Sequence, residues 1–307
     1  MSLLDVKNLK VYYPIKGGIF NRTTDYIKAV DGVSFTIEEG QTLGLVGESG
    51  SGKSTTGRAI LGLEPITGGK IFYNDENIKH IGRNRSLYRK NVQMIFQDVY
   101  SSLNPRKRIK DIIAEPIRNF EKLTPHEEQK RVDELLTIVG MPLASSSKYP
   151  FEFSGGQRQR IGVARAIALK PKLIVADEPV SALDISVQAV VLNYLKEIQE
   201  ELKIAYLFIS HDMGVVKHMC ETLAIMHNAR FVEFGPRDDV YNNPKHIYTQ
   251  RLISAIPNAD PKARKINVQR RMEINNLFYK EYNRFYNQNG RVYDLKRVNG
   301  NHYAAMP

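Results

Sequence analysis

A glycine-rich segment, GESGSGKST at residues 47–55, restricts most strongly what this chain can fold into. It matches the pattern G-x-x-x-x-G-K-[ST], lies after the apolar run TLGLV and precedes a helical pattern from about Lys53. Such a loop needs a strand before it and a helix after it, because its backbone N–H groups must converge on a phosphate without Cβ interference. The segment predicts an α/β fold that binds a nucleoside triphosphate through Gly47, Glu48, Ser49, Gly50, Ser51, Gly52, Lys53, Ser54 and Thr55.

Apolar strands alternate with helical segments along the rest of the chain. KLIVADEP and IAYLFISHD are typical of buried parallel strands, with the helix SVQAVVLNYLKEIQEEL between them. Near the N-terminus, LLDVKNLKVYY and KAVDGVSFTIEEG predict two strands joined by the loop PIKGGIFNRTTD. RIKDIIAEPIRNF and PHEEQKRVDELLTIVGM predict two helices of a polar insert, the second with a capping box from Thr124 to Glu127. We therefore expect an α/β core with a mainly parallel sheet.

Two carboxylates, Asp177 and Glu178, lie at the end of a predicted strand and could complete a metal site together with the glycine-rich loop. Asp177 is placed to hold Mg²⁺ through water, opposite the hydroxyl of Ser54, and Glu178 is the candidate general base. Alone, this pair is equally well a solvated turn, and only its combination with the glycine-rich loop favours catalysis. His211 ends another strand and is either a structural residue or a γ-phosphate contact. Gln97 follows the strand MIF and is a candidate ligand of the metal or the attacking water.

A second candidate phosphate cradle lies at FSGGQRQRIGVARAIAL, residues 153–169. Ser154, Gly155 and Gly156 precede an amphipathic helix pattern, and the N-terminus of a helix exposes N–H groups and favours negative charge. The chain already has a phosphate cradle at residues 47–55, so the phosphate that this second motif would bind is an open question at this point.

These segments, taken in chain order, resemble the motifs of the nucleotide-binding subunit of an ATP-binding cassette (ABC) transporter over residues 3–240. The resemblance implies an ABC nucleotide-binding domain of the P-loop NTPase class, with a RecA-like core, an antiparallel β N-terminal subdomain and an α-helical subdomain at about 99–165. Residues 1–240 would be the ATPase domain, and 241–307 a C-terminal extension with a basic tail. The motifs that carry the resemblance are residues 47–55, Gln97, Ser154-Gly155-Gly156-Gln157, Asp177-Glu178, Ser181-Ala182-Leu183-Asp184 and His211.

The resemblance also implies roles for individual residues. Lys53 and Ser54 would serve the phosphates and Mg²⁺, and Gln97 would join the metal site and sense the membrane subunit. Asp177 would be the metal aspartate, Glu178 the catalytic glutamate and His211 the switch histidine. Ser154, Gly155, Gly156 and Gln157 would complete the ATP site of a partner chain, toward which the loop at 181–184 crosses. Relatives stack adenine on an N-terminal aromatic residue, for which both Tyr13 and Tyr26 are candidates.

Three further segments resemble the ATPases of oligopeptide and dipeptide permeases, best the second or F member of the two oligopeptide-permease ATPases: QDVYSSLNPR, DEPVSALDISVQA and NNPKHIYTQRLISAIPNADPKARK. Ile247 departs from that family, which has a proline after the histidine. The tail also has no cysteine, so we expect no iron–sulfur cluster. The implied function is ATP hydrolysis that energises an oligopeptide importer at the cytoplasmic face of the membrane. The implied partners are a second homologous ATPase subunit in a heterodimer, two transmembrane permease subunits and, through the complex, an extracellular peptide-binding protein.

The charge of the chain leaves one alternative open. The net charge is +11, and residues 262–307 contain ten Lys or Arg and three Asp or Glu, a net +7. Such a balance suits nucleic acid, an anionic membrane or phosphorylated ligands. A non-transport ABC ATPase acting on nucleic acid or ribosomes is the alternative function, and five tail tyrosines superficially suit base stacking: Tyr279, Tyr282, Tyr286, Tyr293 and Tyr303. We favour a solvated surface extension for this tail and expect no nucleic-acid partner.

Overall fold

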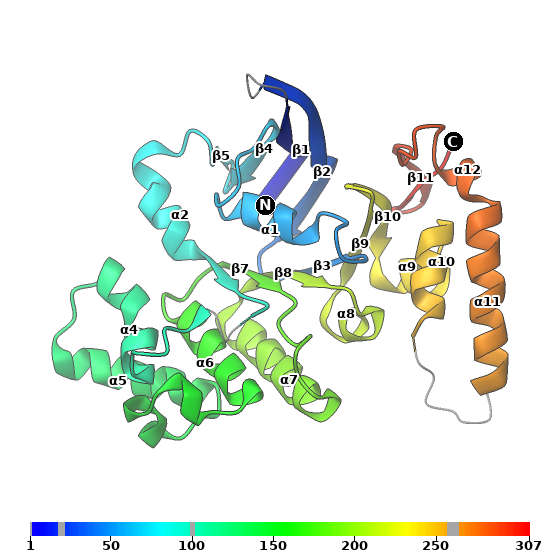
Figure 1. Cartoon of the computed structure of the whole chain (residues 1–307). Coiled ribbons are helices and arrows are strands. Elements are labelled where there is room, and N and C mark those ends of the chain that lie inside the picture. Colours follow the sequence, from blue (N-terminus) through cyan, green and yellow to red (C-terminus); the bar gives the residue numbers. More distant parts are fainter. Residues whose placement is uncertain (1, 18–21, 99–101, 257–263) are drawn as a thin grey trace.

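The computed structural model in Figure 1 describes residues 2–17, 22–98, 102–256 and 264–307. The strands of its larger sheet are β3 (Thr42–Val46), β6 (Val92–Ile95), β7 (Leu173–Asp177), β8 (Ala205–Ser210), β9 (Thr222–His227), β10 (Arg230–Pro236), β11 (Leu295–Asn299) and β12 (His302–Ala305). Among the described residues they lie in the order β11-β12-β10-β9-β3-β8-β7-β6. The five strands from β9 to β6 pair in parallel, and the other three pair antiparallel. The predicted α/β core with a mainly parallel sheet is confirmed.

The central strands of this sheet are buried on both faces. In β7, Leu173 and Val175 pack in the core beneath the N-terminal sheet, whereas Ile174 and Ala176 pack in the core formed with the helices on the opposite face. A strand covered on both faces reads as a continuous apolar run, which is the pattern KLIVA that identified it in the sequence. Asp177 follows this run at the carboxyl end of the sheet, the edge at which open α/β sheets bind their ligands.

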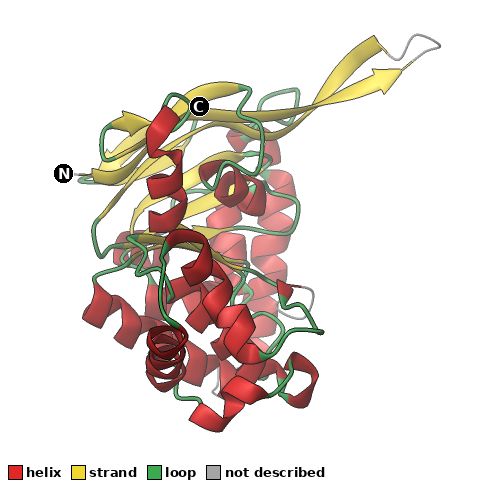
Figure 2. Cartoon of the chain, turned by 90° about the vertical axis from the view of Figure 1, so that its left-hand side faces the viewer, coloured by secondary structure: helices red, strands yellow, loops and turns green. Residues whose placement is uncertain are grey.

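The N-terminal sheet consists of β1 (Ser2–Gly17), β2 (Arg22–Glu38), β4 (Gly68–Tyr73) and β5 (Glu76–Asn77), in the order β2-β1-β4-β5 with antiparallel pairing. The predicted loop at 14–25 is wrong over most of its described length. β1 continues to Gly17 and β2 begins at Arg22, and Figure 2 shows this ribbon projecting from the body of the molecule. Its Gly, Thr and Asn residues resembled a loop, but cross-strand backbone pairing forms the ribbon without a buried face.

The helical region lies beside the core, at the lower left of Figure 1. Residues 99–101, where the predicted helical subdomain begins, lie outside the described residues. Thr124 Oγ1 accepts a hydrogen bond from the Glu127 N–H, and Glu127 Oε2 accepts one from the Thr124 N–H, so the predicted capping box is present. The helices of the chain up to β9 are α1 (Lys53–Ile60), α2 (Arg85–Asn91), α4 (Ile109–Phe120), α5 (Pro125–Ile138), α6 (Gly155–Ile167), α7 (Ile185–Leu202) and α8 (Met213–Met219).

The C-terminal segment is built into the core, so its interpretation as a solvated surface extension is wrong. After α9 (Arg237–Asn242), α10 (Ile247–Ser254), α11 (Arg264–Lys280) and α12 (Tyr282–Phe285), the strands β11 and β12 add to the larger sheet through β10. Tyr286 is 1% exposed and stacks on Tyr282 with ring centroids 4.1 Å apart. Tyr286 is therefore buried and Tyr282 partly buried, whereas Tyr279 is 71% exposed, so Tyr286 at least is not available for nucleic-acid stacking. Within the described residues, none of the helices combines the length and apolar character that a membrane crossing requires.

Candidate functional site

The glycine-rich loop lies between the end of β3 and the start of α1, as the sequence predicts. Close packing explains two of its glycines. A Cβ added at Gly47 would lie 2.1 Å from the carbonyl oxygen of Met226, and one at Gly52 would lie 2.1 Å from that of Ala29. Gly52 also has a φ of +107°, which L side chains rarely adopt. The loop is thus fixed against β9 and β2, and a larger residue at either position would displace it.

Lys53 is buried beneath this loop. Its Nζ donates hydrogen bonds to the carbonyl oxygens of Gly47 at 2.7 Å and Glu48 at 2.8 Å. Burial lowers the pKa of Lys53, and the nearby carboxylates of Glu178 and Asp177 oppose that shift. A desolvated ammonium group held by backbone oxygens gains further partners when an anion enters the loop. The phosphate chain of a nucleotide fits this requirement.

Ser54 and Asp177 form the pair predicted for the metal. The Ser54 hydroxyl donates to Asp177 Oδ1 at 2.8 Å, and Asp177 is 2% exposed. Burial raises the pKa of Asp177, so a bound cation at this carboxylate would offset the cost of its negative charge. Among the described residues no group of three or more His, Cys, Asp or Glu side chains could hold a metal. The donors present suit Mg²⁺, which takes few protein oxygens and completes its shell with phosphate and water.

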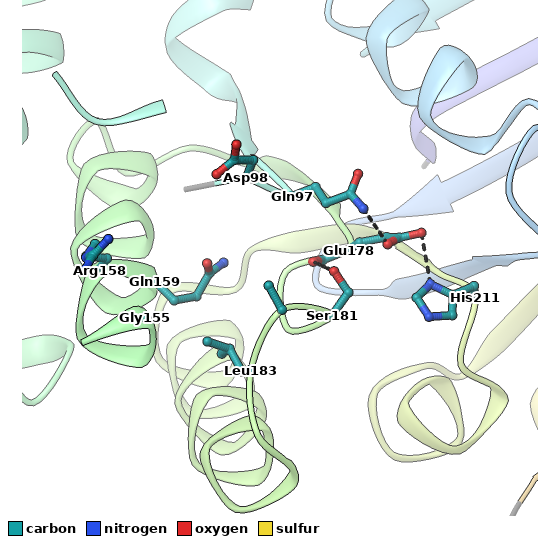
Figure 3. A pocket seen from close by; sticks show the side chains of 10 residues that line it. Gln97, Asp98, Gly155, Arg158, Gln159, Glu178, Ser181, Leu183 and His211 are labelled. Carbon is teal, nitrogen blue, oxygen red and sulfur yellow. Dashed lines mark hydrogen bonds and ion pairs between the residues drawn. The ribbon is translucent and has the colours of Figure 1, made fainter. Parts of the chain in front are cut away.

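Glu178 connects two further predicted residues (Figure 3). Gln97 Nε2 donates to Glu178 Oε2 at 2.8 Å, and His211 Nδ1 lies 3.1 Å from Oε1. The backbone of Glu178 has a φ of +47°, a left-handed conformation that costs a non-glycine residue about 1–2 kcal/mol. Its N–H donates to the Ile209 carbonyl at 2.9 Å, which ties the strained residue to β8. The carboxylate is thereby fixed at the carboxyl end of two adjacent strands.

A cavity of about 530 Å³ joins this carboxylate to the second glycine motif (Figure 3). Gln97, Glu178 and His211 line it from one side, and Gly155 and Leu183 line it from the other. No residue of the glycine-rich loop at 47–55 is among its described lining residues. Gly155 thus shares a cavity with Glu178 and His211, and the described lining of that cavity does not include the phosphate loop.

The segment Ser154–Gln157 forms the start of α6. Ser154 Oγ accepts from the Gln157 N–H at 3.4 Å, and Gln157 Oε1 accepts from the Ser154 N–H at 3.0 Å. A Cβ at Gly156 would lie 2.4 Å from Val187 on α7, so this glycine is required by packing. A Cβ at Gly155 would approach only Leu183, at 3.6 Å, so nothing within the described chain requires glycine there.

The loop Ser181-Ala182-Leu183-Asp184 continues from Glu178 to α7. Ser181 Oγ donates to the Glu178 carbonyl at 3.2 Å, and Gln188 Nε2 donates to the Leu183 carbonyl at 3.0 Å. Ala182 is exposed, and Ile185, the first residue of α7, is 85% exposed. The end of this loop and the start of α7 are therefore accessible from outside the described chain.

Three residues that line the cavity were not predicted: Asp98, Arg158 and Gln159. The only signal available was their position, since Asp98 follows Gln97, and Gln159 lies one helical turn after Gly155. Gln159 is 4% exposed, and its Nε2 has no hydrogen-bond partner among the described residues. This amide faces the cavity as a potential donor.

The two candidate adenine platforms lie in different surroundings. Tyr13 donates to Glu64 Oε2 at 2.8 Å and lies close to Thr55 and Arg58 of α1, while burial raises its pKa. Tyr26 is 50% exposed on the projecting ribbon, with its ring centroid 6.5 Å from that of Tyr12. Only Tyr13 is adjacent to the helix that follows the phosphate loop.

Two protein families match separate parts of the chain. The model described as "ABC transporter" matches residues 30–181, which contain both glycine motifs, Gln97 and the Asp177-Glu178 pair. The model described as "Oligopeptide/dipeptide transporter, C-terminal region" matches residues 232–287, from β10 to just past α12. The helices of the C-terminal segment thus belong to a recognised sequence unit.

Individual proteins are similar over most of the chain. The oligopeptide transport ATP-binding protein OppF of Lactococcus lactis is 58% identical over 307 residues, which is 100% of this chain and 96% of the relative. The dipeptide transport ATP-binding protein DppF of Escherichia coli is 44% identical over 87% of this chain and 80% of the relative. A dimeric ATP-binding cassette, solved in a post-hydrolysis state with ADP and phosphate, has 26% identity and a TM-score of 0.66. That similarity covers 76% of this chain and 98% of the cassette.

Proposed function

The chain belongs to the family of ATP-binding subunits of ABC-type peptide transporters, and from this premise we propose that it binds and hydrolyses MgATP to energise an importer for oligopeptides. The observation that carries the proposal is Glu178, whose carboxylate is held by Gln97 and His211. The Ser54–Asp177 pair supports it. The higher identity to the oligopeptide protein than to the dipeptide protein favours oligopeptides as the transported substrate.

The glycine-rich loop would bind the phosphates of ATP. In this role Lys53, held by the loop carbonyls, also donates to β- and γ-phosphate oxygens, while Tyr13 stacks on the adenine. Ser54, Asp177 and Gln97 would hold Mg²⁺, which supplies positive charge against the phosphate oxygens. Glu178 would accept a proton from the attacking water, and its two partners fix the direction of that carboxylate before substrate arrives.

Ser154, Gly155, Gly156 and Gln157 would bind the ATP of a second, homologous ATPase subunit rather than that of their own chain. Two observations support a composite site in a heterodimer. Gly155 is not required by packing, so its open backbone is available to an external ligand. The exposed apolar residue Ile185 adjoins the loop at 181–184, which would cross to the partner.

Contact with two transmembrane permease subunits would occur at a separate cavity of about 840 Å³. Leu61 and Arg89 line one wall, and Glu115 and Phe120 of α4 line the other. Phe96, immediately before Gln97, also lines it, and the guanidinium of Arg165 lies 5.7 Å from the centre of the Phe96 ring. A cytoplasmic permease helix seated here would move Gln97, and through it Glu178.

The wider assembly places this subunit at the cytoplasmic face of the membrane. Peptide would reach the permease from an extracellular binding protein and would not touch this chain. The permease subunits would supply the path across the membrane, and the two ATPases would close over two MgATP to drive it. Residues 1–240 would provide these ATPase functions, and residues 241–307 would form the permease-type extension.

Glu178→Gln tests the proposal. The amide keeps the size of the side chain but cannot accept the proton, so turnover at this site should fall on the order of 10²–10⁴-fold while the full chain still binds ATP. Glu201→Gln, an exposed change on α7, is the matched control. Turnover retained in the Glu178 variant, measured as phosphate release by the assembled complex, would place the base elsewhere.

A further inference from the structure

The C-terminal segment touches the phosphate loop directly. Tyr248, on α10, accepts a hydrogen bond through its Oη from the backbone N–H of Glu48 at 2.9 Å. Arg251, one turn later on the same helix, has a guanidinium nitrogen 3.4 Å from Glu48 Oε1. These residues lie about two hundred positions apart in the sequence, and both contacts converge on the second residue of the loop.

The peptide group that donates its hydrogen bond to Tyr248 also binds Lys53. The N–H of Glu48 and the carbonyl of Gly47 belong to one planar peptide unit. Its N–H donates to Tyr248, and its carbonyl oxygen accepts from Lys53 Nζ at 2.7 Å. Tyr248 therefore fixes the plane of the peptide that places the Lys53 ammonium group.

Tyr248 is itself held by the C-terminal segment. It is fully buried, and its ring centroid lies 4.1 Å from that of His227 at the end of β9. His227 Nδ1 lies 2.8 Å from the hydroxyl of Tyr286, which follows α12. The guanidinium of Arg251 lies 4.9 Å from the centre of the Phe278 ring on α11. Figure 1 shows α11 alongside α10, on the side of α10 that faces away from β9 and β10.

We infer that Tyr248 is a positioning residue of the nucleotide site, through which the C-terminal segment holds the phosphate loop in its binding conformation. The inference rests on the proposed binding of ATP at residues 47–55. Glycines make up three of the first six residues of this loop, so a peptide group that is not held by other contacts would lose conformational entropy when phosphate binds. Fixing the Gly47–Glu48 peptide in advance reduces that cost and strengthens binding.

Tyr248→Phe removes only the hydroxyl and leaves the Glu48 N–H against an apolar ring. The dissociation constant for MgATP of the isolated full chain should rise about three- to tenfold, the factor that corresponds to one hydrogen bond of ordinary net strength. Equilibrium dialysis with radiolabelled ATP measures it, and thermal unfolding without nucleotide records stability separately. Once ATP is saturating, turnover of the assembled complex should change less than twofold, because the hydroxyl does not touch the reacting groups.

Tyr206→Phe is the matched control. Tyr206 is also fully buried, and its hydroxyl donates to the Leu195 carbonyl at 3.3 Å, in the core beneath β8 rather than at the loop. This variant should lose stability without losing ATP affinity. Arg251→Gln provides a second variant, in which the increase in the dissociation constant should be smaller and should shrink at high salt, because its contact with Glu48 is partly exposed.

The two proposals fail in different ways. A parent chain that bound no ATP would overturn the proposed function, and this inference with it. A parent that binds ATP, with a Tyr248→Phe dissociation constant within twofold of the parent value, would overturn the positioning role alone. Equal losses of affinity in the Tyr248→Phe and Tyr206→Phe variants would also overturn it, because the effect would then follow stability rather than the contact with the loop.

Discussion

The buried imidazole of His246 should make the protein lose stability at mildly acidic pH. His246 precedes α10 as its N-cap and is 0% exposed. Its Nδ1 accepts from the Tyr248 N–H at 3.1 Å, which requires that nitrogen to be unprotonated, and its Nε2 has no partner among the described residues. Burial, together with His227 nearby, lowers the pKa of His246 to about 3.

The sign and size of the effect follow from this pKa. The unfolded chain binds a proton at His246 near the ordinary value of about 6.5, whereas the folded chain resists it down to about 3. The free energy of unfolding is therefore unaffected by this histidine above pH 6.5, and it decreases progressively as the pH falls from 6.5 toward 3. At pH 5 the linkage relation gives a loss of about 2 kcal/mol from this group alone.

His246→Asn removes the titration while keeping an N-cap acceptor for the Tyr248 N–H. Urea unfolding at pH 7.5 and pH 5.0 gives the change in the free energy of unfolding for each protein. The change should be smaller by about 2 kcal/mol in His246→Asn than in the parent. His126→Asn, at an exposed position of α5, should leave the change as it is in the parent. An identical pH dependence in the parent and His246→Asn would refute the reasoning.

Three further predictions concern the two glycines of the second motif and Gln97. Gly155→Asp should preserve folding and ATP binding of the isolated chain but abolish ATPase activity of the assembled complex; loss of ATP binding would contradict the composite site. Gly156→Ala should lower the free energy of unfolding by about 1–3 kcal/mol in urea titrations, because its Cβ would overlap Val187. Gln97→Ala should reduce peptide transport per ATP hydrolysed in reconstituted vesicles more than it reduces ATP affinity, and equal losses would remove the coupling role.

Local sequence patterns were sufficient to predict the structure where a residue's contacts lie within its own segment. The glycine-rich loop and the capping box at Thr124 depend on neighbours within a few residues, so both could be predicted. The contact between Gln97 and Glu178 joins positions 81 apart, and only the strand pairing of β6 with β7 brings them together. The sequence predicts that each follows a strand, but not which strands are neighbours.

The projecting ribbon and the C-terminal strands are two regions whose strand structure was not predicted from the sequence. Residues Arg22–Lys28 are all exposed, so their sequence does not show the apolar alternation of a strand with one buried face. Backbone pairing with β1 makes them a strand. β12 is short, and its pairing with β10 joins Glu233 to Ala304 across 71 positions. Its sequence also lacks a long apolar run. In both places tertiary pairing decided the structure, and local composition pointed to a loop or a solvated tail.

The two adjacent glycines of the second motif, Gly155 and Gly156, differ in whether packing within the chain requires glycine at that position. Gly156 is explained within the chain, because α6 and α7 approach too closely for a Cβ. Gly155 has no such explanation: the nearest atom to its hypothetical Cβ is 3.6 Å away, and its φ is not one that requires glycine. A glycine in the first turn of a helix costs stability relative to alanine, so an unforced one indicates a demand from outside the chain. An anion bound at the α6 N-terminus would make that demand, and the cavity that Gly155 lines has none of residues 47–55 among its described lining residues. Gly155 is thus the residue of the second motif on which the proposed binding of a partner's nucleotide depends.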